Sequence, residues 1–227
     1  PTLQVAVCLF PRVTAMDYQG PVELLGILSS KVRERALNGV SKDLPDLRIE
    51  LTYLSHTLDA VEPTAGPRVV PDKTYDEAQD QFDIILIPGG TTNQWRPNVN
   101  PPKACPDFIL RQAPGAKYIL TVCTGSLILA RTGLLNGKRA TTNKRAFRSV
   151  VEETKDMGIT WVAKARWVAT EDKKIWTGSG ISAGMDLAGG FLDHLVGEQL
   201  GLAMRSFIEL SMKTENDDEF AAYQGLV

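Results

Sequence analysis

The most informative stretch of this chain is Lys117-Tyr118-Ile119-Leu120-Thr121-Val122-Cys123-Thr124-Gly125-Ser126-Leu127-Ile128-Leu129-Ala130-Arg131-Thr132-Gly133. Residues 117–122 form an apolar run typical of a short buried strand, and residues 124–133 have a helical pattern that ends at a glycine. Cys123 therefore lies on a strand-to-helix turn, a nucleophile elbow that projects its sulfur from the sheet. The following helix N-terminus offers N–H groups and positive potential, which we expect to favour the thiolate. The alternative is that Cys123 is a small buried hydrophobic side chain.

Apolar runs and helical patterns alternate in the same way along the rest of the chain. Strands are expected at residues 3–10, 48–55, 83–87, 138–142, 159–169 and 173–178, with a hairpin-like stretch at 61–70. Helices are expected at 21–30, 104–113, 143–157, from Ser182 to about 200 and on to 213, and a helix extension and loop at 31–47. This order predicts an α/β fold, a single-domain sandwich with a mostly parallel central sheet, over residues 1–213. An acidic C-terminal tail, residues 214–227, follows, and we expect it to fray at 214–219.

The composition of the chain narrows the classes of function. The 227 residues carry a net charge of −2, and the 25 basic residues are scattered, so neither a nucleic-acid nor a membrane partner is expected. Three cysteines without framework spacing argue against a secreted disulfide scaffold, and two histidines without paired cysteines argue against a zinc site. The chain shows neither a basic leader nor an apolar run of membrane-spanning length. We therefore expect a cytoplasmic location.

Three features should meet at one edge of the predicted sheet, because ligands of parallel sheets bind at the carboxyl ends of the strands. The first strand leads to Asp17, the strand at 83–87 leads to Gly89 and Gly90, and the elbow carries Cys123. The N–H groups of Gly90 and Thr124 are expected to form a two-donor oxyanion hole. The alternative for the glycine pair is a tight turn that needs glycine for its dihedral angles.

Asp17 also has two readings. It could form an Asx turn or a helix-entry contact before the helix at 21–30, which contains Pro21 in its first turn. It could instead be an acid beside the thiol, with a pKa raised by burial, that donates a proton to sulfur and later to substrate. A Cys–His dyad is poorly supported, because His194 falls within a long helix and His56 ends a strand with no evident reason to reach Cys123.

Five motifs, taken together, resemble the DJ/PfpI (ThiJ) superfamily from Leu3 to about Ser211. They are Asp17-x-x-Gly20-Pro21-x-Glu23, Asp83-x-x-x-Ile87-Pro88-Gly89-Gly90, Val122-Cys123-Thr124-Gly125-Ser126, Ala130-x-x-Gly133-Leu134-Leu135-x-Gly137-x-x-Ala140-Thr141-Thr142, and Thr177-x-Ser179-Gly180-Ile181-Ser182-Ala183-Gly184-Met185-Asp186. The fold of this superfamily resembles that of class I glutamine amidotransferases, which is flavodoxin-like. Within it, Cys-Thr-Gly-Ser and the aspartate before Gly-Pro are similar to the isocyanide (isonitrile) hydratases.

That resemblance implies a cofactor-independent hydro-lyase that converts an isocyanide, a small electrophile, to an N-formamide. It assigns Cys123 as the nucleophile, Asp17 as the proton donor, Gly90 and Thr124 as donors that orient water or stabilise charge, and Gly89 and Ser182 as pocket residues. It also implies a homodimer.

Two departures from the family pattern keep other functions open. Thr124 stands where superfamily proteases and many glyoxalase-type members have histidine, and Asn143, which we interpret as a helix cap, stands where the hydratase-like branch usually has histidine. The alternatives are a glyoxalase, deglycase or other cysteine-dependent enzyme, and a non-enzymatic redox sensor whose Cys123 oxidises to a sulfinic acid.

Overall fold

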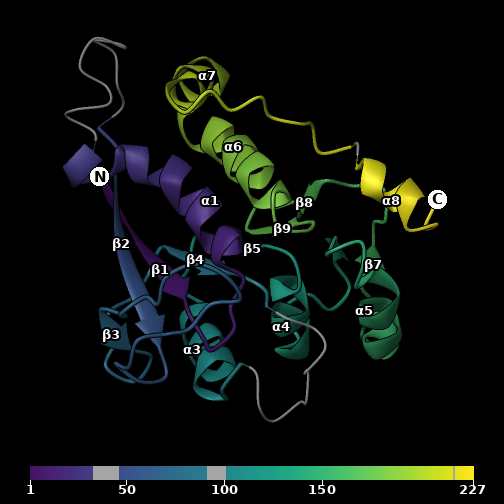
Figure 1. The fold of residues 1–227 in the computed structure, drawn as a ribbon, viewed down its shortest axis with the longest axis horizontal. Coiled ribbons are helices and arrows are strands. Elements are labelled where there is room, and N and C mark those ends of the chain that lie inside the picture. The colour runs from purple at the N-terminus through teal and green to yellow at the C-terminus, as the bar shows by residue number, and fades with distance from the viewer. Residues whose placement is uncertain (33–45, 91–100, 217) are drawn as a thin grey trace.

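The computed structural model describes residues 1–32, 46–90, 101–216 and 218–227. Within these residues the central sheet has seven strands in the order β3-β2-β1-β4-β5-β9-β8, and only β8 runs antiparallel to its neighbour (Figure 1). The strands are β1 Thr2–Cys8, β2 Arg48–Ser55, β3 Lys73–Thr74, β4 Ile84–Ile87, β5 Tyr118–Thr121, β8 Trp167–Ala169 and β9 Ile175–Gly178. The predicted single-domain α/β fold with a mostly parallel sheet is confirmed.

Helices cover both faces of this sheet (Figure 1). One face carries α1 Ala15–Leu25, α6 Ala183–Val196 and α7 Glu198–Phe207, and the other carries α3 Ala104–Gln112 and α4 Gly125–Arg131. The remaining elements lie to one side of the sheet or close its turns: α5 Phe147–Glu153, α8 Glu219–Tyr223, the short helices Gly26–Leu28 and Lys155–Met157, and a two-stranded sheet of β6 Arg139–Ala140 and β7 Thr160–Trp161.

The central strands of the sheet determine where the candidate residues lie, because those residues are expected at the carboxyl ends of these strands. All four residues of β4 are buried, as are the last three of β5, because helices cover both faces. β4 pairs in parallel with β1 on one side and with β5 on the other. Each fully buried aliphatic side chain of this kind contributes about 2 kcal/mol to folding. The carboxyl ends of β1, β4 and β5 are thereby held next to one another.

The helix expected at 21–30 begins earlier than predicted, at Ala15, and Pro21 lies inside it. The reason is the crossing of α1 and α6. A Cβ on Gly20 would lie 2.8 Å from Met185 Cγ, and one on Gly184 would lie 3.3 Å from Pro21 Cγ. This close packing keeps the helix intact through the proline, against its local preference. As a result, Asp17 lies in the first turn of α1 rather than before it.

Two other predicted elements are divided in the structure. The strand expected at 159–169 becomes β7 and β8, which belong to different sheets. Between them the main chain bends so that the carbonyl of Val162 accepts from Thr141 Oγ1 and that of Ala165 accepts from Lys144 Nζ. The helix expected from Ser182 ends at Val196, because Gly197 adopts a φ of 85° and starts α7 in a new direction.

The acidic C-terminal segment does not fray as expected; its described residues dock on the domain. The Arg166 N–H donates to the carbonyl of Glu215, and the Asp218 N–H donates to the carbonyl of Lys164. Asp218 is 2% exposed and caps α8 by accepting from the Phe220 N–H. Acidic composition alone indicates a solvated segment, but the buried cations Lys144 and Arg166 pair with Asp218 and hold this segment on the domain.

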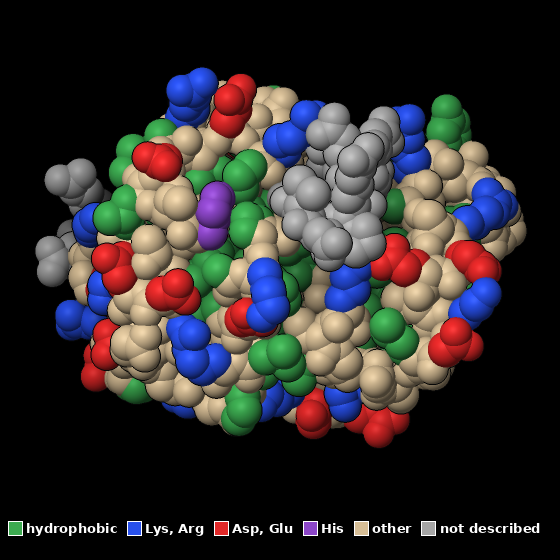
Figure 2. All heavy atoms as spheres, turned by 90° about the horizontal axis from the view of Figure 1, so that it is seen from below, with side chains coloured by type: hydrophobic (Ala, Val, Ile, Leu, Met, Phe, Trp, Pro, Cys, Tyr) green, Lys and Arg blue, Asp and Glu red, His purple; other side chains and the backbone are tan. Residues whose placement is uncertain are grey.

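Three further predictions need correction: the helix expected at 143–157 begins only at Phe147, the helical stretch expected to 213 ends at Phe207, and the strand expected at 138–142 is the short β6 outside the central sheet. The hairpin-like stretch at 61–70 is confirmed by the antiparallel bridge between Val61 and Val69. Most of the segment 31–47 lies outside the described residues. Figure 2 shows a face on which basic and acidic side chains are interspersed. None of the helices in the described residues has the length and apolar character to cross a membrane.

Candidate active site

Cys123 lies on the predicted elbow, between the end of β5 and the start of α4. Its φ of 59° places it in the left-handed region, which a non-glycine residue adopts at a cost of about 1–3 kcal/mol. Hydrogen bonds to its main-chain N–H and to its carbonyl hold it in this conformation. Its N–H donates to the carbonyls of Ser179 (2.8 Å) and Gly178 (3.2 Å). Its carbonyl accepts from the hydroxyls of Ser126 (3.0 Å) and Thr142 (3.1 Å).

Two glycines allow the neighbouring strands to approach the elbow. A Cβ on Gly125 would lie 2.1 Å from the carbonyl oxygen of Ile87, so α4 can start against β4 only with glycine there. A Cβ on Gly89 would lie 2.5 Å from Thr124 Oγ1 and 3.1 Å from Asp17 Oδ2. Gly89 therefore lies between the elbow and Asp17.

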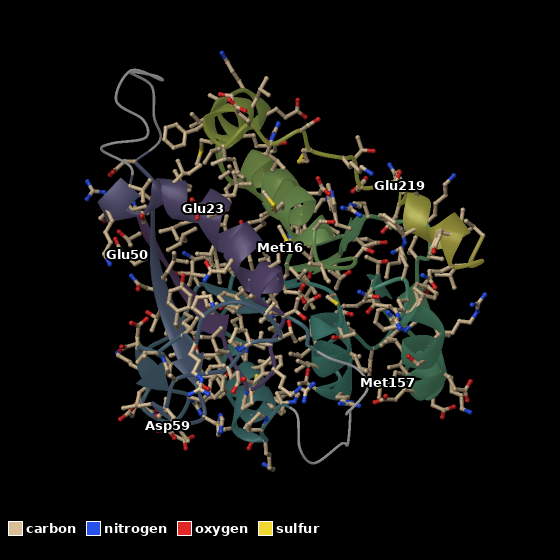
Figure 3. The ribbon with its side chains drawn as sticks, in the orientation of Figure 1. Met16, Glu23, Glu50, Asp59, Met157 and Glu219 are labelled. Atoms are coloured by element: carbon tan, nitrogen blue, oxygen red, sulfur yellow. The ribbon has the colours of Figure 1, made fainter. Side chains whose placement is uncertain are left out.

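Asp17 is fully buried beside the elbow, in the turn of α1 that Met16 marks in Figure 3. Its Oδ2 accepts from the Gly89 N–H at 2.9 Å, and its Oδ1 is buried without a hydrogen-bond partner among the described residues. Burial raises the pKa of Asp17 to about 7, and the Gly89 N–H and the Cys123 thiol oppose that rise. The carboxyl therefore exchanges a proton with its surroundings near neutral pH, as the second reading of its sequence position expected.

The sulfur of Cys123 has three donors around it. Asn143 Nδ2 lies 3.2 Å from Sγ, and it lowers the pKa of the thiol together with the N–H groups of Thr124 and Ile181. Burial and then the Asp17 carboxylate act more strongly in the opposite direction and raise that pKa to about 12. The Thr124 N–H at the turn lowers the pKa of the thiol as expected, but burial and Asp17 outweigh it, so the thiol form predominates at neutral pH. Protonation of Asp17 removes the second of these two contributions, so the thiolate is less disfavoured when Asp17 holds a proton.

The predicted oxyanion hole is different in the structure. The Gly90 N–H donates to Thr124 Oγ1 at 3.2 Å, and that hydroxyl also lies 3.3 Å from the Gly90 carbonyl oxygen. Gly90 thus orients the Thr124 side chain instead of directing its N–H at sulfur. The N–H of Thr124 faces the sulfur as predicted, and its partner donor is the N–H of Ile181.

Asn143 and Ile181 are the site residues that sequence reasoning missed. Asn143 Oδ1 accepts from the N–H groups of Arg145 (2.9 Å) and Ala146 (3.2 Å), so it caps the turn at 144–146 rather than α5 itself, whose N-cap is Ala146. The same side chain reaches Cys123 with its other end. Ile181 has a φ of 42°, next to Gly180, where a Cβ would lie 2.6 Å from Asn143 Nδ2. The available signal was that Ile181 lies in the motif that follows β9 and that Asn143 directly follows the motif that ends at Thr142.

The other candidate residues lie apart from the sulfur. The Ser182 hydroxyl accepts from Arg166 Nη2 at 3.1 Å, and the described contacts of Ser182 include neither Cys123 nor Asp17. His194 packs against the rings of Tyr118 and Trp176, at the opposite end of β5 from Cys123. Among the described residues, three or more His, Cys, Asp or Glu side chains are nowhere grouped as a metal site would require.

A cysteine on a left-handed strand-to-helix turn, at the edge of a mostly parallel sheet, defines a nucleophile-elbow α/β protein. Residues 3–194 match the model of the DJ-1/PfpI family, and the chain belongs to that family. This confirms the resemblance seen in the sequence motifs.

Individual relatives differ in their activities. The chain is 33% identical to an isonitrile hydratase of Pseudomonas putida over 198 residues, which are 86% of this chain and 73% of that protein. It is 25% identical to a deglycase of Pyrococcus furiosus over 111 residues, 46% of this chain and 63% of that protein. A ThiJ/PfpI family protein of Pseudomonas syringae has the same fold, with a TM-score of 0.74 at 24% identity over 100% of this chain and 86% of that one.

Proposed function

We propose that this protein is a cofactor-independent enzyme that hydrates an isocyanide to an N-formamide, with Cys123 as nucleophile and Asp17 as proton carrier. The observation that carries the proposal is the buried pair itself. Its two groups have pKa values of about 7 and about 12, so the pair holds one proton over the whole range between them. The identity of 33% to an isonitrile hydratase supports the choice of substrate.

In the first step the S–H group of Cys123 adds across the isocyanide carbon. Sγ passes its proton to the Asp17 carboxylate and forms a bond to that carbon, and the protonated Asp17 then gives a proton to the same carbon. The product is a thioformimidate, R–N=CH–S–Cys123, and Asp17 is a carboxylate again. A positioned proton carrier of this kind typically contributes about 10²–10⁴-fold to a rate.

In the second step water completes the hydration. Asp17 takes a proton from water as the oxygen bonds to the formimidate carbon, and that proton is delivered to nitrogen. The tetrahedral adduct R–NH–CH(OH)–S–Cys123 then loses its C–S bond. The hydroxyl proton passes through Asp17 back to Sγ, which releases R–NH–CHO and restores the thiol. The sum is one isocyanide and one water consumed for each formamide.

The three donors around Sγ have a role whenever the sulfur carries negative charge. The N–H groups of Thr124 and Ile181 and the amide of Asn143 all lower the pKa of Cys123. They therefore stabilise the thiolate as it attacks and again as it leaves. Donors that are already in place when charge develops are typically worth about 3 kcal/mol each. Gly90 contributes indirectly, because it holds the Thr124 hydroxyl.

Two other functions remain as alternatives that experiment separates. A glyoxalase or deglycase activity would use the same nucleophile, although Thr124 stands where many glyoxalase-type members have histidine. A redox sensor would need a sulfur that oxidises readily, and oxidation follows thiolate character. A Cys123 pKa of about 12 is unfavourable for that role. The homodimer expected from the family resemblance stays a proposal, which sedimentation of the purified protein tests.

The direct test is formamide production from a simple aromatic isocyanide by the wild type and by Cys123→Ala. We expect turnover in the wild type and none in the variant, whose side chain lacks the nucleophile. A Cys105→Ala variant serves as the matched control, because Cys105 is also a buried free cysteine but lies on α3. Absence of formamide with the wild type, together with conversion of methylglyoxal to lactate, would overturn the proposal in favour of the glyoxalase alternative.

A further inference from the structure

A depression with a cavity volume of about 180 Å³ lies on the surface beside the candidate site. Its lining includes Asn143, Gly180 and Ile181, together with Phe220 of α8 and Gln224, the residue that follows that helix. Glu219, labelled in Figure 3, marks the start of that helix. Phe220 is 48% exposed and Ile181 is 43% exposed, so both present apolar surface here. The depression therefore combines an apolar lining with polar groups.

The lining connects the depression to the nucleophile. Asn143 Nδ2 is 3.2 Å from Cys123 Sγ, and the N–H of Ile181 is one of the donors to the same sulfur. Gly180 leaves the space that the amide of Asn143 occupies, since a Cβ there would come within 2.6 Å of Nδ2. If the reacting carbon of a substrate is at Sγ, the depression therefore lies no more than one side chain away from that carbon.

The α8 wall of the depression is fixed by buried charges. Asp218, just before α8, lies 3.6 Å from Lys144 Nζ and 3.8 Å from Arg166 Nη1. Arg166 also pairs with Asp186 at 2.8 Å. All four of these side chains are at least nine-tenths buried. At the end of α8, Arg148 donates to the carbonyls of Gln224 and Gly225. The wall is therefore a built surface rather than a loose tail.

Among the described residues that line the depression, Arg145 is the cation that is not balanced by an anion. The two buried cations Lys144 and Arg166 are balanced by the two buried anions Asp186 and Asp218. Arg145 also lines the depression, is exposed, and its side chain has no partner among the described residues. An exposed guanidinium beside apolar surface favours a ligand that has an apolar body and a carboxylate.

We propose that this depression is a subsite for the organic substituent of the substrate, and that it selects isocyanides with an aromatic or aliphatic body ending in a carboxylate. The apolar body lies against Ile181 and Phe220, and the carboxylate pairs with Arg145. As a statement of substrate class this rests on the proposed hydration. The subsite itself is testable through any reagent that reacts with Cys123.

The test compares two alkylating reagents of the same shape, 4-(bromomethyl)benzoate and 4-(bromomethyl)benzamide. The rate of alkylation of Cys123 is followed by peptide mass spectrometry for the wild type and for Arg145→Gln. We expect the benzoate-to-benzamide rate ratio to fall about fivefold in Arg145→Gln, the size of effect typical of an exposed ion pair. Phe220→Ala should slow both reagents alike. Arg139→Gln is the matched control, since Arg139 is an exposed arginine that lines a different depression.

An unchanged ratio in Arg145→Gln, or an equal fall in Arg139→Gln, would overturn the subsite. The same variants are then assayed with carboxylated and neutral aromatic isocyanides, where Arg145→Gln should raise KM for the carboxylated one only. If alkylation shows the expected ratio but neither isocyanide gives formamide, the proposed reaction fails while the subsite stands. If formamide is made with no carboxylate preference in either assay, the subsite fails while the reaction stands.

Discussion

The two sides of Cys123 are held by different physical means. On the α1 side, Asp17 and Thr124 are brought to the sulfur by main-chain approaches that only glycine at position 89 permits. On the opposite side, Asn143 and Ile181 are supported by neighbours that belong to a buried ionic network. The first side depends on close packing and the second on charge pairing. Substitutions on the two sides should therefore impair the protein in different ways.

The largest effect is expected from Asp17→Asn, on the α1 side. The amide keeps the shape of the carboxyl and can still accept from the Gly89 N–H, but it cannot carry a proton between sulfur and carbon. We expect kcat/KM for isocyanide hydration to fall by about 10³-fold. Steady-state assays of formamide formation measure this. A variant within tenfold of the wild type would remove Asp17 from the mechanism.

The same substitution should stabilise the folded protein. The ordinary pKa of Asp17, 3.8, is raised to about 7 by burial, so the folded state holds this proton more tightly than the unfolded state does. The free energy of unfolding of the wild type therefore falls as pH rises from about 4 to about 7, by roughly 4 kcal/mol in total. In Asp17→Asn this carboxyl is absent, so its free energy of unfolding should not fall over the same pH range. Urea unfolding at pH 8 should therefore show the variant to be more stable than the wild type. Equal or lower stability at pH 8 would contradict the buried, proton-binding carboxyl.

On the opposite side, Asp218→Asn should mainly reduce stability. Removal of this carboxylate leaves Lys144 and Arg166 buried with one fewer anion, at a cost of about 3 kcal/mol. The pKa of Lys144, which burial lowers to about 8 while Asp218 opposes that effect, should fall further. Urea unfolding at pH 7 measures the loss. Glu219→Gln, which removes an exposed acid next in sequence, is the control and should change stability little.

Gly89→Ala tests whether the α1 side depends on close packing. Its new Cβ would lie 2.5 Å from Thr124 Oγ1 and 2.6 Å from Thr124 N, so the main chain must move. We expect a loss of about 2 kcal/mol in stability. Because the strain lies between Asp17 and the elbow, activity should fall as well. A fully active, fully stable variant would show that this approach is not required.

The smallest effect is expected from Asn143→Ala. The variant loses one donor to the sulfur, and two others remain on main-chain N–H groups. We expect kcat to fall about tenfold, and the rate of alkylation of Cys123 at a fixed pH to fall with it. The alkylation readout distinguishes a weaker thiolate from a simple loss of the cap. Asn143→Asp, which keeps the capping oxygen but replaces the donor, should be at least as slow as Asn143→Ala.

The contrast between the two sides also explains what the sequence could predict. Local patterns around Cys123, Asp17 and Gly89 correctly indicated the sheet, the elbow and the meeting of the strand ends. The start of α1 differs from the local signal of Pro21 because tertiary packing around Gly20 overrides that signal.

Local sequence patterns do not predict the arrangement on the side of Asn143 and Ile181. The composition of residues 214–227 indicated a solvated tail, and only the fold brings Asp218 to cations far away in the sequence. The roles of Asn143 and Ile181 depend on side-chain and N–H directions that motifs do not encode. The same is true of the Gly90 N–H, whose partner is a hydroxyl rather than the reacting sulfur.

The most direct test of the shared proton is the pH dependence of kcat/KM for hydration of an aromatic isocyanide, measured for the wild type and for Asp17→Asn. The reactive form of the pair has one proton, and Asp17 must lose its own to reach that form from acid. We predict that the wild-type value rises about tenfold per pH unit below about pH 7 and is level from there to pH 9. In Asp17→Asn the inflection near pH 7 should vanish, and the rate should climb through pH 9 with ionisation of Cys123. A wild-type profile that is level from pH 5 to 9, or an inflection near pH 7 that survives in Asp17→Asn, would contradict the proton-sharing mechanism.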